Sequence, residues 1–384
     1  MTLESTTELA AGSGPGARAG ATATVARVQP GPTAGQRLRK GASLRNASAV
    51  YIFWLLFAVF AIWEPDTFLT AQTWRALLEN QAITAMVAIG LMVPLSAGVV
   101  DLAVGSEVGL GAIVVAWLLA DRHLNPALAI ALTLVVGAAI GLVITQLIVR
   151  ARIGSFIATL GMSSVLLAVI DWVSGSQQIL NLGSGFQNIA TGQFLGITYP
   201  VYILAVISLL VWYFLERTPS GRRVYATGGN IEAAKLAGVR TSRVILAATV
   251  ACGVITALAG TLQSAQLATG DPTIANSYLL PAFAAAFLGS TQFKGGRFNV
   301  PGTLVAVAAL AEGVQGLELA GAPVWLPNLF DGVALLLAVG FAQVQRAPSA
   351  RTAAIRRFLR PGGGSGSADG SGSGSGPGSA ERVG

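Results

Sequence analysis

Residues Val244–Gly270 read VILAATVACGVITALAGTLQSAQLATG and contain no Asp, Glu, Lys or Arg. A helix needs about 20 mostly apolar residues to cross the hydrocarbon core of a membrane, so this stretch is long enough to span one. Three other uncharged stretches are Gln81–Val100, Leu124–Val149 and Ile153–Ile170. A buried core helix is usually shorter, which indicates a fold built from membrane-spanning helices.

The composition of the whole chain agrees with a membrane location. Charged residues make up 11% of its 384 residues, and its mean hydropathy is +0.66. An ordinary soluble domain has about 25% charged residues, so lipid must cover much of this chain. We predict an all-α, polytopic membrane fold with about ten transmembrane helices. The expected spans are residues 48–63, 80–99, 102–120, 127–149, 153–173, 199–215, 243–266, 276–291, 299–318 and 325–345.

The positions of the basic residues test this count, because short cytoplasmic loops carry an excess of Lys and Arg. With ten spans and the amino terminus inside, all 24 Lys and Arg residues fall in cytoplasmic segments except Arg75 and Arg122. This alternation predicts a multi-pass membrane protein with both termini in the cytoplasm. It also explains the net charge of +7 without a nucleic-acid partner, which would need the charges on one folded face.

The chain divides into three parts by composition. Residues 1–47 lack apolar periodicity, and residues 346–384 include a Gly/Ser-rich tract, so both are expected to be flexible cytoplasmic tails. Residues 48–345 form the predicted transmembrane domain, whose largest basic cytoplasmic loop is residues 216–243.

The sequence lacks the residues that common enzyme sites require. It has no H-E-x-x-H zinc motif, no G-x-S-x-G nucleophile motif and no G-x-x-x-x-G-K-[ST] phosphate-binding motif. Cys252 is the only cysteine and His123 the only histidine. We therefore expect no enzyme activity, cofactor or metal, and any energy from ATP must come from another subunit.

The loop 216–243 reads ERTPSGRRVYATGGNIEAAKLAGVRTSR and predicts a short helix. Asn230 is a good N-cap, Glu232 suits the positive end of the helix dipole, and Gly238 can end the helix. Gly228 and Gly229 are expected to break the chain before it. The small residues Ala233, Ala234 and Ala237 would let this helix enter a groove on another protein, with Glu232 and Lys235 free for polar contacts. The alternative is a solvated connecting loop.

This loop carries a resemblance to a known family. Residues Gly221–Gly238 are similar to the coupling segment G-R-x-V-Y-A-x-G-G-N-x-E-A-A-x-L-x-G of permeases in ribose-type, binding-protein-dependent bacterial importers. Ser96–Ser106 resembles the family's G-G-x-D-L-S-V-G-S segment, and Phe156–Gly161 resembles P-F-I-A-T-L-G without its proline. Leu288–Arg297 loosely resembles G-G-T-S-x-x-G-G-R.

The resemblance implies a permease subunit of an ATP-binding cassette (ABC) importer for a sugar. Such a subunit would work as a homodimer or heterodimer, with ATP-binding subunits below and a solute-binding protein outside. By similarity, residues 230–238 would form the coupling helix, and Glu232, Ala233, Ala234 and Gly238 match the family's positions.

Two departures from the family pattern concern the segment around Asp101. Val99 replaces a glycine, which would reduce backbone freedom there. Glu107 is ionisable where the family pattern is small or apolar, so it either has a functional role or faces a wet cavity or an interface without a specific role. For Asp101 we favour capping of the following helix over direct contact with substrate.

A sugar pathway should be polar but mostly uncharged. The candidate pathway or gating residues are Asp101, Ser106, Glu107, Thr159 and Ser163. Thr159 and Ser163 lie four residues apart and would share one helix face, although such hydroxyls also bond to the carbonyls of their own helix.

Two other kinds of transporter remain open. An ion-coupled secondary transporter would need ionisable residues in its spans, for which Asp101, Glu107, Asp171, Glu312 and Asp331 are the material. A permease for a branched-chain amino acid or a nucleoside would have a similar architecture and a different solute.

Overall fold

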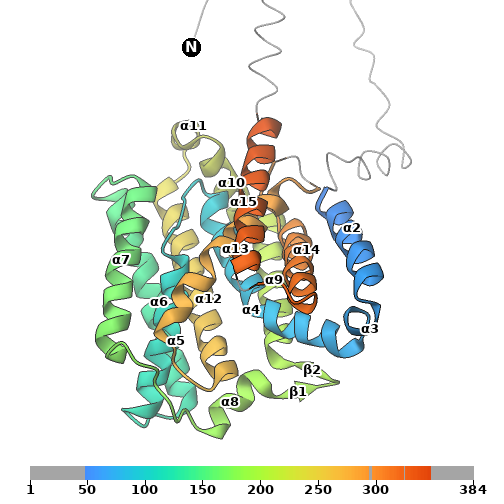
Figure 1. Ribbon diagram of the computed structural model, residues 1–384. Coiled ribbons are helices and arrows are strands. Elements are labelled where there is room, and N and C mark those ends of the chain that lie inside the picture. The colour runs from blue at the N-terminus through green and yellow to red at the C-terminus, as the bar shows by residue number, and fades with distance from the viewer. Residues whose placement is uncertain (1–47, 294–295, 324, 347–384) are drawn as a thin grey trace, which may run out of the picture. The chain divides into compact units, whose positions relative to one another are not determined.

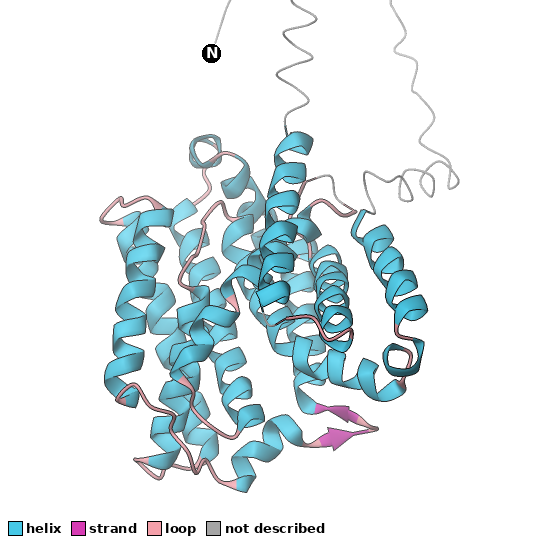
Figure 2. Cartoon of the chain, viewed as in Figure 1, coloured by secondary structure: helices cyan, strands magenta, loops and turns pink. Residues whose placement is uncertain are grey.

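The computed structural model describes residues 48–293, 296–323 and 325–346 (Figures 1 and 2). The elements in chain order are α2 (Ser48–Trp63), α3 (Pro65–Phe68), α4 (Ala71–Ser96), α5 (Val104–Ala120), α6 (Pro126–Val149), α7 (Ser155–Ser174), α8 (Ser184–Thr191), β1 (Gln193–Phe194), β2 (Ile197–Thr198), α9 (Tyr199–Arg217), α10 (Pro219–Gly229), α11 (Ile231–Leu236), α12 (Thr241–Leu267), the 3-10 helix η1 (Pro272–Ser277), α13 (Leu279–Ser290), α14 (Val300–Leu319) and α15 (Trp325–Arg346). The two predicted tails lie outside the described residues, apart from Arg346 at the end of α15.

Each predicted span overlaps one helix of the structure. Six helices in the described chain are long and apolar enough to cross a membrane, namely α4, α6, α7, α9, α12 and α14. Shorter apolar helices lie in α2, α5 and α15, and α13 has 12 residues. The membrane fold is therefore supported, while the count of ten spans remains a prediction.

The second span begins earlier than expected. Helix α4 starts at Ala71 rather than at residue 80, because the Thr70 side chain accepts a hydrogen bond from the Thr73 N–H at 3.2 Å and caps the helix. The charged residues Arg75 and Glu79 thus belong to the helix. Pro94 lies inside the same helix, close to its end at Ser96.

Helices α4 and α12 form the interior of the bundle. About two thirds of the most apolar part of α4 (67%) is buried, and the figure for α12 is 61%, against 17% for α9 and 22% for α7. Helix α12 packs against α4, α5 and α6. The outer helices leave large apolar side chains exposed, for example Trp172 on α7 and Leu209 on α9, where lipid would cover them.

Glycines let α6 and α12 approach each other closely. A Cβ atom on Gly137 would collide with the carbonyl oxygen of Gly253, and one on Gly141 would collide with that of Thr249. Small residues allow such close contact where lipid supplies no hydrophobic drive for helix association. Another glycine pair of this spacing, Gly105 and Gly109 on α5, packs mainly against Ala275 of η1, with Leu279 of α13 and Ile170 of α7 close by.

A small hairpin qualifies the all-α prediction. Strands β1 and β2 pair antiparallel with Gln193 opposite Thr198, and the Tyr202 hydroxyl donates to the Phe194 carbonyl oxygen at 2.8 Å. Helix α8 precedes the hairpin, so the segment between the predicted spans 153–173 and 199–215 contains regular structure. Figure 1 places this hairpin at the opposite end of the bundle from α11.

The glycine contact between α6 and α12 can be tested by Gly137→Ala. The added methyl group should lower the melting temperature of the purified protein in detergent by several degrees, since overpacking costs about 1–3 kcal/mol. Gly161→Ala on α7 is the matched control, because a Cβ there meets nothing within 4 Å. The control should be neutral or stabilising, as alanine favours a helix over glycine by about 1 kcal/mol. Equal loss of stability in both variants would contradict the packing.

Candidate functional site

The predicted helix in the basic loop is present as α11. The Asn230 Oδ1 accepts a hydrogen bond from the Ala233 N–H at 2.9 Å, which is the expected N-cap. Gly238 follows the helix with φ of +81°, a left-handed conformation that favours glycine. The helix spans Ile231–Leu236, so it is slightly shorter than expected.

The glycine pair before α11 does not break the chain as predicted. Gly228 and Gly229 are the last residues of α10, and the direction changes at Asn230, where φ is −160° and ψ is 108°. Helix α10 is itself capped by Thr218, whose hydroxyl oxygen accepts from the Gly221 N–H at 3.2 Å.

The exposed face of α11 differs from the one that the alanines suggest. Ala234 is buried against its own chain, while Ala233 and Ala237 are exposed. Glu232 and Lys235 bind each other through an ion pair of 2.9 Å. Leu236, which sequence reasoning did not single out, is 91% exposed. The capped helix therefore presents Leu236 to solvent.

Helix α10 packs directly on the chain break between α4 and α5. A Cβ atom on Gly228 would collide with the Ser96 carbonyl oxygen, and one on Gly98 would lie 3.1 Å from the Cα of Gly228. The two backbones touch because neither glycine has a side chain. This contact joins the segment before α11 to the segment that ends α4.

Tyr225 attaches α10 to a third segment. Its hydroxyl donates to the Phe298 carbonyl oxygen at 2.8 Å, and the Arg297 guanidinium lies 4.0 Å from the centre of its ring. Burial, followed by the charge of Glu216, raises the pKa of Tyr225 to about 12, so the phenol stays protonated and can donate. Helix α10 thus links the end of α4 to the turn before α14.

Three of the stretches that carry the family resemblance meet around one cavity of about 640 Å³. It is lined by Leu95, Ser96, Gly98, Val100, Tyr225, Gly228, Gly229, Phe287, Gly296, Arg297 and Phe298. The sequence separates these residues widely, and only the fold brings them together.

The chain break itself spans residues 97–103, between α4 and α5. Gly98 has φ of +82°, whereas Val99 is not among the described residues with positive φ, so the loss of the family's second glycine causes no backbone strain. The capping prediction for Asp101 is wrong in detail. Its Oδ1 accepts from the Ala103 N–H at 3.0 Å, but the helix begins at Val104, so the carboxylate closes the turn before α5.

Helix α7 holds the break by hydroxyl groups. The Thr159 Oγ1 accepts from the Leu102 N–H at 3.0 Å and also donates to the Ser155 carbonyl oxygen at 2.9 Å. The Ser106 hydroxyl donates to the Ser163 hydroxyl oxygen at 3.1 Å. Thr159 and Ser163 therefore share a face, as the spacing predicts, and this face is turned toward the break and α5.

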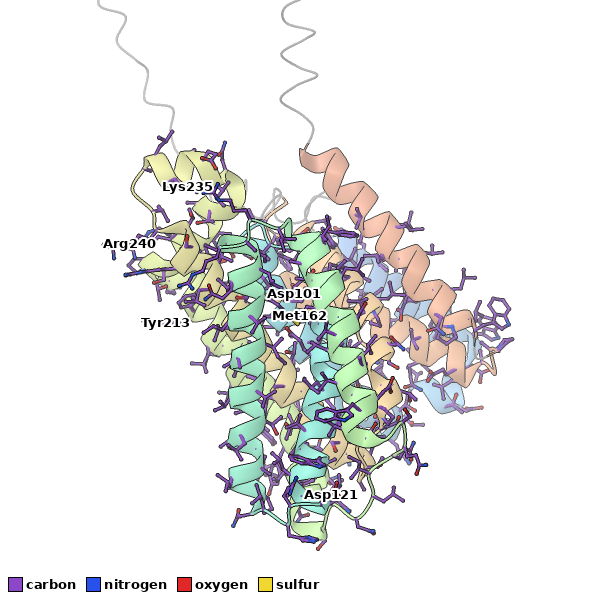
Figure 3. The ribbon with its side chains drawn as sticks, turned by 90° about the vertical axis from the view of Figure 1, so that its left-hand side faces the viewer. Asp101, Asp121, Met162, Tyr213, Lys235 and Arg240 are labelled. Carbon is purple, nitrogen blue, oxygen red and sulfur yellow. The ribbon has the colours of Figure 1, made fainter. Side chains whose placement is uncertain are left out.

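Glu107 is buried between α5 and α12. It is 1% exposed, and its Oε2 accepts a hydrogen bond from the Thr256 hydroxyl at 2.7 Å. Glu107 therefore lies at a buried interface between helices rather than in a wet cavity. Figure 3 shows Asp101 nearer to the end of the bundle that carries Lys235 and Arg240 than to the end that carries Asp121.

A polar cavity that the sequence did not reveal lies elsewhere in the bundle. It measures about 220 Å³ and is lined by Gln81, Thr84, Ser277, Tyr278, Pro281, Ala285, Val307, Leu310, Ala311, Val314 and Asp331. The Tyr278 hydroxyl donates to the Gln263 Oε1 at 2.6 Å, and the Gln266 side chain donates to Asn80 at 3.2 Å. The side-chain amides that interrupt these apolar spans are the sequence feature that could have predicted this group of polar residues.

The chain is similar to sugar permeases of several bacteria. The ribose import permease protein RbsC of Escherichia coli (strain K12) is 31% identical over 313 residues, which cover 79% of this chain and 96% of the relative. The L-arabinose ABC transporter permease protein AraH of Azospirillum brasilense is 33% identical over 325 residues, covering 83% and 95%. The fructose import permease protein FrcC of Rhizobium meliloti is 30% identical over 306 residues, covering 77% and 84%.

No solved structure matches the chain. The family model described as "Branched-chain amino acid transport system / permease component" matches residues 76–339. The relatives confirm the resemblance to ribose-type permeases that the four sequence stretches indicate. By the extent of these matches, the chain belongs to this family of transport-system permease components.

Proposed function

We propose that this protein is the permease subunit of an ABC importer that carries a monosaccharide across the bacterial inner membrane. The observation that carries the proposal is the contact chain from α11, which presents Leu236 to solvent, through α10 to the break between α4 and α5. The similarity to ribose, arabinose and fructose permeases supports the choice of a sugar.

The ATP-binding subunit would dock on α11, where Gly228, Gly229, Asn230, Glu232, Ala233, Ala234, Lys235 and Gly238 form or flank the docking helix. This end of the bundle is then the cytoplasmic one, with both termini inside. The basic residues Lys235 and Arg240 at this end support that orientation (Figure 3), since cytoplasmic loops are enriched in Lys and Arg.

Force from the ATP-binding subunit would reach the pathway through rigid contacts. A shift of α11 moves α10, and Gly228 then presses on Ser96 and Gly98 at the end of α4. Rigid-body gating needs only small shifts of this kind. In this scheme Asp101, Ser106, Glu107, Thr159 and Ser163 serve gating, because they join the break to α5, α7 and α12, and they need not contact the sugar.

The cavity lined by Gln81, Thr84, Ser277 and Tyr278 suits a sugar pathway. The amide and hydroxyls of these residues can exchange hydrogen bonds with sugar hydroxyls, and Asp331, which also lines the cavity, can accept from them. The opposite end of the bundle, with the hairpin and α8, would receive the solute-binding protein. Two permease subunits, identical or related, would enclose the pathway.

Transport by the intact complex tests the proposal. The complex, purified through a tag on this chain and reconstituted in liposomes with its solute-binding protein, should take up radiolabelled ribose, arabinose or fructose only when ATP is supplied. Uptake of leucine or a nucleoside with no uptake of sugars would assign a different solute, as the family model's description allows. Uptake driven by an ion gradient without an ATP-binding subunit would refute the mechanism.

The docking role of α11 predicts the effect of Leu236→Asp. Loss of a central apolar contact typically costs at least 2 kcal/mol, so the ATP-binding subunit should bind roughly 30-fold more weakly in a pull-down titration. Leu195→Asp is the control, since Leu195 is 84% exposed on the hairpin at the other end. If both variants bind like the unmodified protein, α11 is not the docking helix.

The lever role of α10 predicts a difference between two adjacent glycines. Gly228→Ala should separate α10 from the break, so that uptake falls about tenfold or more, corresponding to roughly 1.4 kcal/mol, while ATP hydrolysis by the complex continues. Gly229→Ala should lower uptake much less than Gly228→Ala, because a Cβ there meets nothing within 4 Å in this chain. Full coupling in the Gly228 variant would show that the contact transmits no force.

A further inference from the structure

Three side chains with metal-binding atoms meet inside the bundle. One carboxylate oxygen of Asp101, one of Glu107 and the sulfur of Cys252 lie within 4.8 Å of one another. Asp101 comes from the break, Glu107 from α5 and Cys252 from α12. None of the three side chains is more than 1% exposed.

Both carboxylates are only half satisfied. The Asp101 Oδ1 accepts from the Ala103 N–H at 3.0 Å, and the Glu107 Oε2 accepts from the Thr256 hydroxyl at 2.7 Å. The other two oxygens, Asp101 Oδ2 and Glu107 Oε1, are buried and have no hydrogen-bond partner in the described part of the chain. A buried polar atom without a partner is costly, and so is a pair of close negative charges.

Within the described residues, no ion pair joins a basic side chain to these carboxylates; the ion pair found there is Lys235 with Glu232, at the surface of α11. Carboxylates buried this deeply are normally paired with a cation or coordinate a metal. Two buried carboxylates that each keep an unpartnered oxygen, beside a buried sulfur, therefore point to a bound cation.

We propose that Asp101, Glu107 and Cys252 bind one divalent transition-metal ion of intermediate softness, of which zinc is the type. Such ions accept thiolate and carboxylate ligands together, with Zn–S near 2.3 Å and Zn–O of about 2.0–2.2 Å. Ligand atoms around a tetrahedral ion lie about 3.5 Å apart, so the three atoms, which lie within 4.8 Å of one another, would have to approach by about 1 Å when the ion binds. Harder ions such as magnesium would not use the thiol.

Binding of the metal ion would also release the thiol proton and restrict movement of the α4–α5 break. The thiol loses its proton to the solvent when the sulfur binds the ion, so affinity rises with pH. The ion would join the break to α5 and α12, and it would hold these elements in the arrangement seen here. By holding these elements together, the ion would inhibit transport. That inhibition rests on the proposed function, whereas the metal site itself does not.

Cobalt binding tests the site without any transport assay. Full-length protein free of polyhistidine tags should retain one Co²⁺ per chain after desalting and show the near-ultraviolet absorption of a Co²⁺–thiolate bond. Cys252→Ser should lose this absorption, and Glu107→Gln should lose at least tenfold in affinity. Glu312→Gln should bind like the unmodified protein, because Glu312 is a buried carboxylate without partners that lies outside the cluster.

Thermal unfolding shows whether a metal ion or bound protons neutralise the carboxylates of Asp101 and Glu107. Zn²⁺ should raise the melting temperature of the unmodified protein and of Glu312→Gln, but not of Cys252→Ser, whose near-identical shape keeps the fold. If no Co²⁺ is retained, or if retention is the same in Cys252→Ser and Glu107→Gln, the proposal is overturned. Stabilisation of the metal-free protein by Glu107→Gln together with no Co²⁺ uptake would show that protons neutralise the pair.

Discussion

The contact between the backbones of α10 and the α4–α5 break is the constraint on which the functional part of the structure depends. It exists because Gly228 and Gly98 have no side chains, so that two chain segments more than a hundred positions apart can touch directly. Around this contact the fold assembles Tyr225 with the turn before α14, and the hydroxyls of α7 with the break. A contact between backbones has little freedom to adjust, which makes it suitable for passing movement from one segment to another.

The polar side chains inside the bundle fall into groups that differ in how fully their hydrogen bonds are satisfied. Hydroxyl groups on α7 satisfy backbone amides that the break leaves free, as lipid offers no water to do so. Amides and a phenol form a separate layer near η1, where a neutral solute could exchange hydrogen bonds. The carboxylates of Asp101 and Glu107 belong to neither group, because each keeps one oxygen without a donor.

Much of this arrangement could be predicted from local sequence. The uncharged runs located the helices, and the Asn230 cap with Gly238 located α11, because these signals depend on neighbours along the chain. The early start of α4 was missed since charged residues within its first turns looked like a loop. The orientation of Ala234 and Leu236, the role of Gly228 and the meeting of Asp101 with Cys252 depend on contacts between distant segments, which no local pattern reports.

Pro94 makes α4 easier to bend near its carboxyl-terminal end, inside the bundle. Proline has no N–H to donate, so the carbonyl group of Gly90, one turn earlier, lacks its usual partner within the helix. Gly90 itself packs its backbone near Ile255 of α12 and has no side chain to stiffen that turn. Helix α4 can therefore bend between these two residues at lower cost than elsewhere, which sets the axis about which its terminal turn would swing.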